Sequence, residues 1–141
     1  MVEKDTNNKI LAIVYSDKNK LLLLRTNPKT MKLDFWYVVT RGVKEKESFK
    51  QAVKREIEEE TKLKILKIKS TDFSWDYEWP SGSKKIKHEK AFLVKVKHDE
   101  PKITKYEHLE YKWLSKTDFI KKIHWFGESK TNLKKLLKEV K

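Results

Sequence analysis

The chain contains no cysteine and no long apolar run. Without cysteine there can be no disulfide bond, thiolate metal site or catalytic thiol, a pattern typical of cytosolic proteins. No window approaches the roughly 20 apolar residues that a transmembrane helix needs. Residues 1–5 include acidic side chains and lack the apolar stretch of a signal peptide. We therefore expect a cytoplasmic protein with no membrane partner.

Arginine is also scarce, although the formal net charge is +13 at pH 7. Only Arg25, Arg41 and Arg55 are arginines among the 34 basic residues, and the lysines are spread along the whole chain. Base recognition and phosphate clamping favour the bidentate guanidinium group over lysine. The charge therefore indicates a solvated lysine surface more than a nucleic-acid groove, and RNA 5′ ends stay as the one alternative nucleic-acid partner.

Internal repeats and low-complexity linkers are absent as well. The 141 residues are 38% hydrophobic and 11% aromatic, which excludes an intrinsically disordered chain even though 39% are charged. A chain of this length fits one domain and removes about two thirds of its unfolded surface from water on folding. Residues 1–141 are therefore predicted to form a single domain with a genuine core.

Residue periodicity predicts the order of secondary structure. Apolar and β-branched runs bounded by turn residues predict strands at 10–15, 21–24, 35–39, 63–68, 73–79, 91–96 and 110–114. Apolar spacings of three and four predict helices at 48–61, 117–123 and 132–140, with Ser48 as the first N-cap. Residues 26–33 are expected to form a loop. This order predicts an α/β protein whose mixed β-sheet has helices packed on its faces, an α/β/α sandwich.

The first predicted helix contains the acidic segment Arg55-Glu56-Ile57-Glu58-Glu59-Glu60. At about 100° per residue, Glu56, Glu59 and Glu60 project within a sector of about 100°, while Glu58 points elsewhere. Carboxylates this close raise one another's pKa unless a cation neutralises them. Oxygen ligands suit Mg²⁺, which binds together with substrate phosphates and can activate a water whose proton a glutamate accepts.

Two further features bear on this helix. Lys54 and Glu58 are spaced as an i,i+4 pair, as on an ordinary solvated helix face, and the helix by itself favours that simpler interpretation. Glu47 lies where the preceding loop meets the helix. Arg55 is offset around the helix from Glu56, so it is expected to bond back to Glu47 and to have a structural role.

The segments 42–47 and 55–60, separated by seven residues, closely resemble the Nudix box. The pattern of that box is Gly, five residues, Glu, seven residues, then Arg-Glu-apolar-any-Glu-Glu-any-Gly-apolar. The acidic half matches throughout, and the resemblance makes Gly42, Glu47 and Arg55 the structural support of the box. The glycines depart from it: the first falls on Arg41, one place before Gly42, the loop glycine on Lys46 and the last on Lys62.

Other segments resemble the bacterial dihydroneopterin triphosphate pyrophosphatase branch of the Nudix family, which is also known for hydrolysing dATP. They are Asp34-Phe35-Trp36, Val39-Thr40 and Glu107-His108-Leu109-Glu110-Tyr111-Lys112-Trp113-Leu114. The resemblance covers most of the chain and implies a Nudix-type fold. It implies that Glu56, Glu60 and Glu107 bind the metal, and that Glu59 binds metal or activates water.

Substrate contacts are expected from three further residues. The resemblance places Thr40 and Arg25 at or near the substrate phosphate, with an ordinary surface or strand-end position as an equal alternative. Trp36 is one of several tryptophans able to stack on a base or pterin ring, although most of them are expected in the core or at its rim. The other candidates are Trp75, Trp79 and Trp125. The four histidines have no metal-ligand spacing and are assigned no role.

These features predict a Mg²⁺-dependent pyrophosphohydrolase, with Mn²⁺ as a substitute metal. Its substrate would be dATP, another nucleoside triphosphate or dihydroneopterin triphosphate, cleaved to a monophosphate and pyrophosphate. One alternative is hydrolysis of dinucleoside polyphosphates or RNA 5′ ends. Another is a catalytically idle Nudix module that binds nucleotide or RNA, against which the retained glutamate cluster argues. Monomer and homodimer are both compatible with the sequence.

Overall fold

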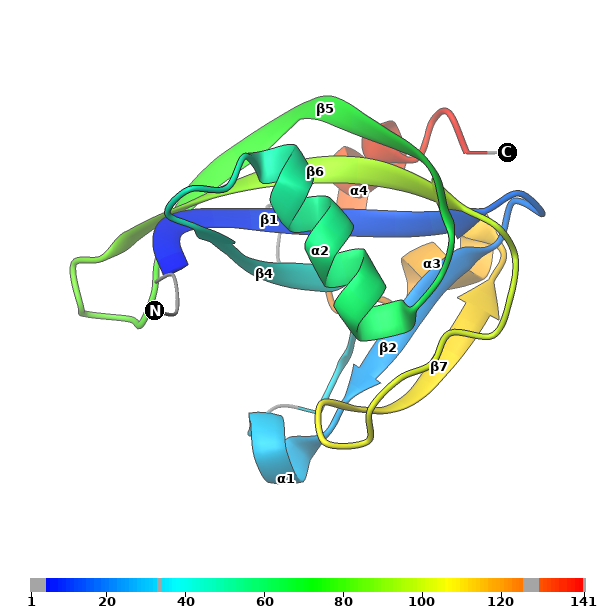
Figure 1. Cartoon of the computed structure of the whole chain (residues 1–141), viewed down its shortest axis with the longest axis horizontal. Helices are drawn as coiled ribbons and strands as arrows, with labels where there is room; N and C mark the ends of the chain where they lie inside the picture. The colour runs from blue at the N-terminus through cyan, green and yellow to red at the C-terminus, as the bar shows by residue number, and fades with distance from the viewer. Residues whose placement is uncertain (1–4, 33, 126–129, 141) are drawn as a thin grey trace.

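Seven strands form one mixed sheet in the part of the chain that the computed structural model describes, residues 5–32, 34–125 and 130–140 (Figure 1). The main path of the sheet is β3 (Trp36–Tyr37), β2 (Leu21–Thr26), β1 (Asp5–Ser16), β6 (Ile86–Val96) and β5 (Ile65–Glu78). Off this path, β4 (Val39–Lys44) pairs with β1, and β7 (His108–Leu114) pairs with β2. β1 and β6 run parallel, and the other pairs run antiparallel.

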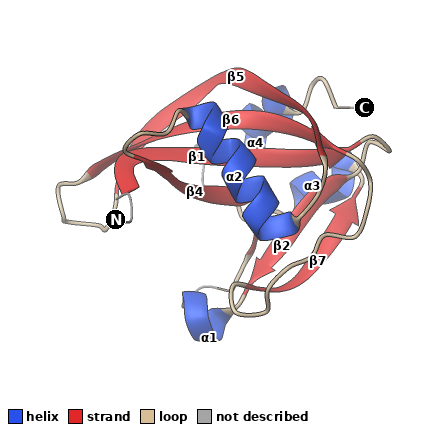
Figure 2. Cartoon of the chain, in the orientation of Figure 1, coloured by secondary structure: helices blue, strands red, loops and turns tan. Residues whose placement is uncertain are grey.

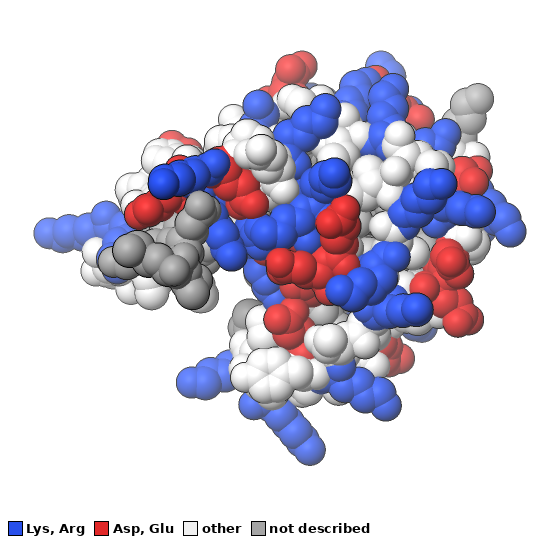
Figure 3. Space-filling model, in the orientation of Figure 1, with Lys and Arg blue, Asp and Glu red and all other residues white. Residues whose placement is uncertain are grey.

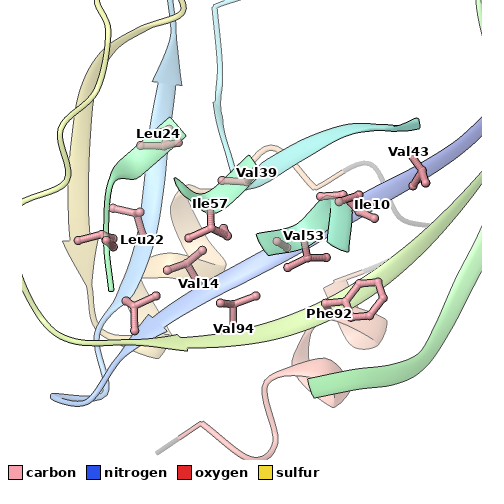
Figure 4. Close-up of a cluster of buried hydrophobic side chains, with 14 residues drawn as sticks. Ile10, Val14, Leu22, Leu24, Val39, Val43, Val53, Ile57, Phe92 and Val94 are labelled. Atoms are coloured by element: carbon pink, nitrogen blue, oxygen red, sulfur yellow. The ribbon is translucent and has the colours of Figure 1, made fainter. Parts of the chain in front are cut away.

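Helices cover both faces of this sheet, as Figure 2 shows. α2 (Phe49–Thr61) packs on one face, and α3 (Lys116–Lys122) and α4 (Lys130–Leu136) pack on the other. β1 divides its buried side chains between the two layers. Ile10 and Val14 belong to the α2 side, drawn in Figure 4, and Leu11 and Ile13 belong to the other side. The predicted α/β/α sandwich with a mixed sheet is confirmed.

α2 is fixed at its start and along its buried face. Ser48 is its N-cap, as predicted: Ser48 Oγ accepts a hydrogen bond from Gln51 N at 3.1 Å, and Gln51 Oε1 accepts one from Ser48 N at 2.8 Å. This capping box satisfies two N–H groups that the helix itself cannot pair. Val53 and Ile57 are fully buried against the sheet (Figure 4), and burial of each side chain contributes roughly 1.5–3 kcal/mol. The acidic residues of α2 therefore stand on a rigid element.

Part of the loop predicted at 26–33 is helical. Pro28–Met31 forms the short helix α1, which follows directly after β2. Asn27 Oδ1 accepts a hydrogen bond from Lys29 N at 3.0 Å, and the fixed φ of Pro28 suits the first turn. The local cap and proline outweigh the polar composition that predicted a loop.

The strand predicted at 35–39 is divided into two. Trp36–Tyr37 forms β3, and β4 begins at Val39 and continues through Lys44, where a loop was expected. β4 pairs with the first part of β1, where Gly42 lies opposite Lys9. The long-range pairing with β1, which local sequence does not show, makes this segment a strand.

The strands predicted at 63–68 and 73–79 are one strand, β5. The polar residues between them interrupt the apolar pattern, but the strand continues. The register of its pairing with β6 shifts between Ser70 and Ser74, and there Thr71 Oγ1 donates a hydrogen bond to Ala91 O on β6 at 2.7 Å.

α4 ends four residues before the predicted end at residue 140. Its predicted apolar stripe is nevertheless buried: Leu133, Leu136, Leu137 and Val140. Within the described ranges, no helix is long and apolar enough to cross a membrane.

Candidate active site

A bidentate salt bridge ties the loop before α2 to the helix. Arg55 Nε lies 2.7 Å from Glu47 Oε2, and Arg55 Nη2 lies 2.9 Å from Glu47 Oε1. Arg55 Nη2 also donates to Gly42 O at 3.2 Å, and Glu47 Oε1 accepts a hydrogen bond from Lys44 N at 3.1 Å. These contacts, led by the Arg55 bond, hold the pKa of Glu47 below its ordinary value. The structure thus contains the Arg55–Glu47 contact that the sequence predicts.

Of the four glutamates of α2, Glu56 and Glu60 form a buried pair, and Glu58 and Glu59 are exposed. Glu56 and Glu60, one turn apart, are 5% and 8% exposed. The Glu59 side chain is 59% exposed, and its Oε2 lies 3.7 Å from Arg55 Nη1. Arg55 Nη1 is also bonded to Glu56 Oε1. α2 therefore presents two carboxylates inward and one at the surface beside them.

Glu107 reaches this pair from the loop between β6 and β7. Thr104 O accepts hydrogen bonds from the backbone N of Glu107 at 3.1 Å and of His108 at 2.9 Å. Asn27 N donates to Glu107 O at 2.9 Å, and Asn27 Nδ2 donates to Lys105 O at 2.6 Å. The residue that caps α1 thus also holds the loop that supplies Glu107.

Arg41 on β4 joins these carboxylates. Its Nη2 lies 3.0 Å from Glu60 Oε1 and 2.9 Å from Glu107 Oε2, and its Nε lies 3.9 Å from Glu56 Oε2. The sequence shows Arg41 only as a departure from the first glycine of the box. The structure shows that its guanidinium is a counter-ion for the three residues to which the resemblance assigns metal binding.

The cluster is electrostatically strained. Burial raises the pKa of Glu56 and of Glu60, and the positive charges of Arg55 and Arg41 only partly offset this effect. Burial also acts to raise the pKa of Glu107, but a hydrogen bond shared with Glu60 and the contact with Arg41 outweigh it, so that this pKa is lowered. Buried carboxylates held so close to one another favour binding of a cation.

His108 completes the cluster, although the sequence predicts no role for it. Its Nδ1 lies 3.3 Å from Glu60 Oε2, but this contact lacks hydrogen-bond geometry, and the atom is buried without a hydrogen-bond partner among the described residues. Burial, followed by the charge of Arg41, lowers its pKa to about 4. The imidazole is therefore neutral at pH 7, the form that binds metal ions. Its position next to Glu107 was the available sequence signal.

This donor set fits a divalent cation. Glu60, Glu107 and His108 offer ligand atoms that lie within 4.8 Å of one another. Carboxylate oxygens suit Mg²⁺, and an unpaired imidazole nitrogen is a further donor for a transition metal such as Mn²⁺. Figure 3 shows the face of the molecule on which α2 lies, where acidic side chains are grouped in the middle with Lys and Arg around them. Glu56 lies beside the group and is held by Arg41 and Arg55.

A cavity of about 610 Å³ begins at this cluster. β1 pairs with β4 up to Ala12 and with β2 at Tyr15, so β4 and β2 diverge from it (Figure 1), and both contribute to the cavity wall. Arg41, Glu60 and His108 line one part of the cavity. Another part is lined by Trp75, Tyr77, Trp79 and Glu89. This volume is within the range of small-molecule sites.

The three predicted substrate contacts are separated in the structure. Thr40 lines the cavity beside Arg41. Arg25 and Trp36 are not among the described residues that line it. Arg25 bonds to Asp34 at 3.0 Å and to Glu110 at 2.9 Å, and these bonds raise its pKa. The Trp36 ring is 4.7 Å from Lys122 Nζ and 5.6 Å from Lys112 Nζ. Substrate binding by Arg25 and Trp36 stays a prediction.

The sequence matches the family model of the NUDIX domain over residues 6–135. The chain belongs to the Nudix family. Nudix hydrolases act on phosphoric anhydride bonds and generally use divalent metals, so the chain is a hydrolase of this class with an acidic cluster suited to such a metal. No curated protein matches the sequence at a significant level.

Several solved Nudix structures share the fold. The E. coli dihydroneopterin triphosphate pyrophosphohydrolase is 24% identical, with a TM-score of 0.71, and the match covers 99% of this chain and 98% of that one. An Ap4A hydrolase from C. elegans is 21% identical, with a TM-score of 0.64 and 93% of each chain covered. The MutT protein from Methanosarcina mazei Go1 is 24% identical, with a TM-score of 0.62 and coverage of 87% and 88%. At these identities the likeness shows the fold.

Two of the missing Nudix-box glycines have different structural consequences. Lys46 lies in a turn and is not among the described residues with positive φ, so its position does not require glycine. Lys62 ends α2 with φ 59 and ψ 17, the left-handed conformation in which a side chain is unfavourable. Lys62 N donates to Glu58 O at 3.1 Å, so the turn forms despite its side chain.

Replacing Lys62 by Gly is therefore expected to raise the free energy of unfolding by about 1 kcal/mol. The exposed Lys54 in the middle of α2 is the matched control, and Lys54→Gly should lower the free energy of unfolding by about 1 kcal/mol. Urea denaturation followed by circular dichroism measures both changes. Equal destabilisation by the two substitutions would show that the conformation of Lys62 costs nothing.

Proposed function

We propose that this Nudix hydrolase is a Mg²⁺-dependent pyrophosphohydrolase. Its substrate is a nucleoside triphosphate-like molecule, such as dATP, another nucleoside triphosphate or dihydroneopterin triphosphate, which it cleaves to a monophosphate and pyrophosphate. The main support is the position of the carboxylate cluster at a cavity that also has aromatic walls. A metal site for phosphates thus adjoins a site for a planar ring.

The residues of the cluster have distinct roles in this proposal. Glu56, Glu60 and Glu107 would hold the metal, which when bound would neutralise phosphate charge and activate a water. Thr40 lines the same cavity, and its hydroxyl would donate a hydrogen bond to a phosphate oxygen. The surrounding lysine surface, part of the net charge of +13, attracts the polyphosphate chain.

Hydrolysis proceeds by attack of the water oxygen on a phosphorus atom of the chain. The bond from that phosphorus to the bridging oxygen breaks, and pyrophosphate leaves. The exposed Glu59, next to the buried pair on α2, accepts the proton of the water. Arg55 keeps the loop and the helix in place through Glu47, so that the carboxylates do not separate during turnover.

The test is the release of pyrophosphate and phosphate with Mg²⁺, with Mn²⁺ and with EDTA. The panel contains dATP, the other nucleoside triphosphates, dihydroneopterin triphosphate, diadenosine polyphosphates and an RNA with a 5′-triphosphate. Metal-dependent pyrophosphate release from a triphosphate is expected. Turnover of diadenosine polyphosphates alone would indicate a dinucleoside polyphosphate hydrolase, and turnover of RNA alone would indicate an RNA 5′-end hydrolase. Nucleotide binding without any turnover would indicate a catalytically idle module.

A further inference from the structure

A buried carboxyl group lies in the aromatic part of the cavity, where the metal cluster does not use it. Glu89 on β6 is only 6% exposed. Its Oε1 accepts a hydrogen bond from Trp75 Nε1 at 2.9 Å, and Tyr77 also bonds to its carboxylate. β1 separates β6 from β4, the strand that carries Arg41. A buried carboxyl is costly to maintain and is therefore a candidate for a functional role.

The walls around Glu89 suit a flat heterocycle. Phe35, Tyr37, Trp75, Tyr77 and Trp79 line the same cavity. Trp79 is 57% exposed and offers its ring at the surface, while Trp75 is partly buried. Aromatic side chains bind planar ligands through their faces but do not distinguish one ring from another. Distinction between rings requires a polar group, and Glu89 is a buried polar group bonded to two of these aromatic side chains, Trp75 and Tyr77.

The hydrogen-bonding capacity of Glu89 defines the ring edge it can bind. An ionised carboxylate only accepts hydrogen bonds and has about four lone-pair sites, of which Trp75 and Tyr77 use two. Guanine and pterins present a ring N–H beside an exocyclic amino group, two adjacent donors that match two carboxylate oxygens. Adenine presents an amino group beside a ring nitrogen that is an acceptor, so that nitrogen would face a carboxylate oxygen.

We propose that Glu89 is a specificity-determining residue that selects substrates with the 2-amino-4-oxo edge shared by guanine and pterins. This inference rests on the proposed function, because it concerns the ring of the triphosphate whose phosphates reach the metal cluster. It narrows the substrate class, since dATP lacks this edge. Separate tests of a guanine compound and a pterin compound show which of the two rings the site binds.

The protonation of Glu89 gives an independent prediction for the unmodified protein. Burial raises its pKa to about 7, against the hydrogen bonds from Trp75 and Tyr77 and the charge of Lys9. Lys9 on β1 and Tyr77 on β5 are the ionisable groups that the described strands place against it. Binding of two donors requires the ionised form, so affinity for a guanine or pterin ring is fully present above pH 7 and is lost as the pH falls below it. An adenine ring, which pairs with the protonated form, would show the opposite trend.

Glu89→Gln tests the assignment, with Asp76→Asn as its matched control. Gln still accepts the Trp75 bond and keeps the shape of Glu, but an NH₂ group that only donates replaces one of the two accepting oxygens. Asp76 also lines the cavity, and its substitution removes the same charge from an exposed side chain that is paired with His88 at 2.8 Å. Calorimetric titration with GMP, pterin and AMP in EDTA measures ring binding without turnover, and thermal melts show whether each variant is folded.

We expect Glu89→Gln to weaken binding of GMP and pterin by about 10- to 100-fold and to strengthen binding of AMP, with Asp76→Asn unchanged. The ratio of kcat/KM for GTP or dihydroneopterin triphosphate to that for ATP should fall by a similar factor. An unchanged ratio, or a wild-type preference for AMP that increases at low pH, would overturn the inference while leaving the hydrolase intact. Absence of all turnover would instead remove the proposed function, and the EDTA titrations would still test Glu89.

Discussion

Replacing Glu60 by Gln is expected to lower kcat/KM for the best triphosphate about a thousandfold or more while the protein stays folded. Glu60 is the residue of the cluster that contacts both Arg41 and His108, and it is 8% exposed. Gln keeps its size but removes the charge, and its amide nitrogen donates where a metal ligand must accept. A thousandfold loss corresponds to about 4 kcal/mol of transition-state stabilisation.

Glu58→Gln is the control for this substitution. Glu58 is on the same helix and loses the same charge, but it is exposed and lies outside the cluster, so wild-type rates are expected. Thermal melts of both variants separate a lost metal ligand from a lost fold. Electron paramagnetic resonance of added Mn²⁺ should show weaker binding to Glu60→Gln alone. Wild-type turnover and Mn²⁺ binding in Glu60→Gln would contradict the metal assignment.

The parts of the site built from local sequence were predictable. The capping box, the spacing of Val53 and Ile57, and the position of Arg55 relative to Glu47 all depend on residues within one helix and the loop before it. Helical periodicity fixes such relations, because positions three and four apart always lie together. The α/β/α arrangement followed from the same logic, since each helix has one apolar face to bury.

The contacts made between distant segments were not predictable from the sequence. Arg41 reaches Glu60 and Glu107 because β4 pairs with β1. A short segment that contains Gly42 and several polar residues resembles a loop until that pairing forms. His108 meets Glu60 through the loop that Asn27 holds. Glu89 occupies a strand position where a charged residue ordinarily faces solvent. Tertiary structure decides these three positions, and each is central to the proposed chemistry.

Replacing Arg41 by Gln is expected to destabilise the metal-free protein by about 2 kcal/mol and to increase its stabilisation by Mg²⁺. The guanidinium lies 3.0 Å from Glu60 and 2.9 Å from Glu107, so its loss leaves the buried Glu60 and the partly buried Glu107 without this counter-ion. In a Nudix box with glycine at this position, no side chain supplies such a charge. Mg²⁺ must compete with Arg41 for the carboxylates, and the midpoint of a Mg²⁺ titration should therefore fall about tenfold or more in Arg41→Gln.

Arg25→Gln is the matched control, because Arg25 also bonds to two acidic residues, Asp34 and Glu110, but outside the cavity. The melting temperatures of both variants and of the wild type are measured with EDTA and over a range of Mg²⁺ concentrations. The rise in melting temperature with Mg²⁺ is then compared between the three proteins. The Arg25 variant should show the wild-type response to Mg²⁺. If Arg41→Gln also gains no extra stability from Mg²⁺, the guanidinium and the metal do not share the carboxylates. If it does gain, the arginine at the glycine position of the box keeps the cluster folded before metal binds, and sets the Mg²⁺ concentration at which the enzyme becomes active.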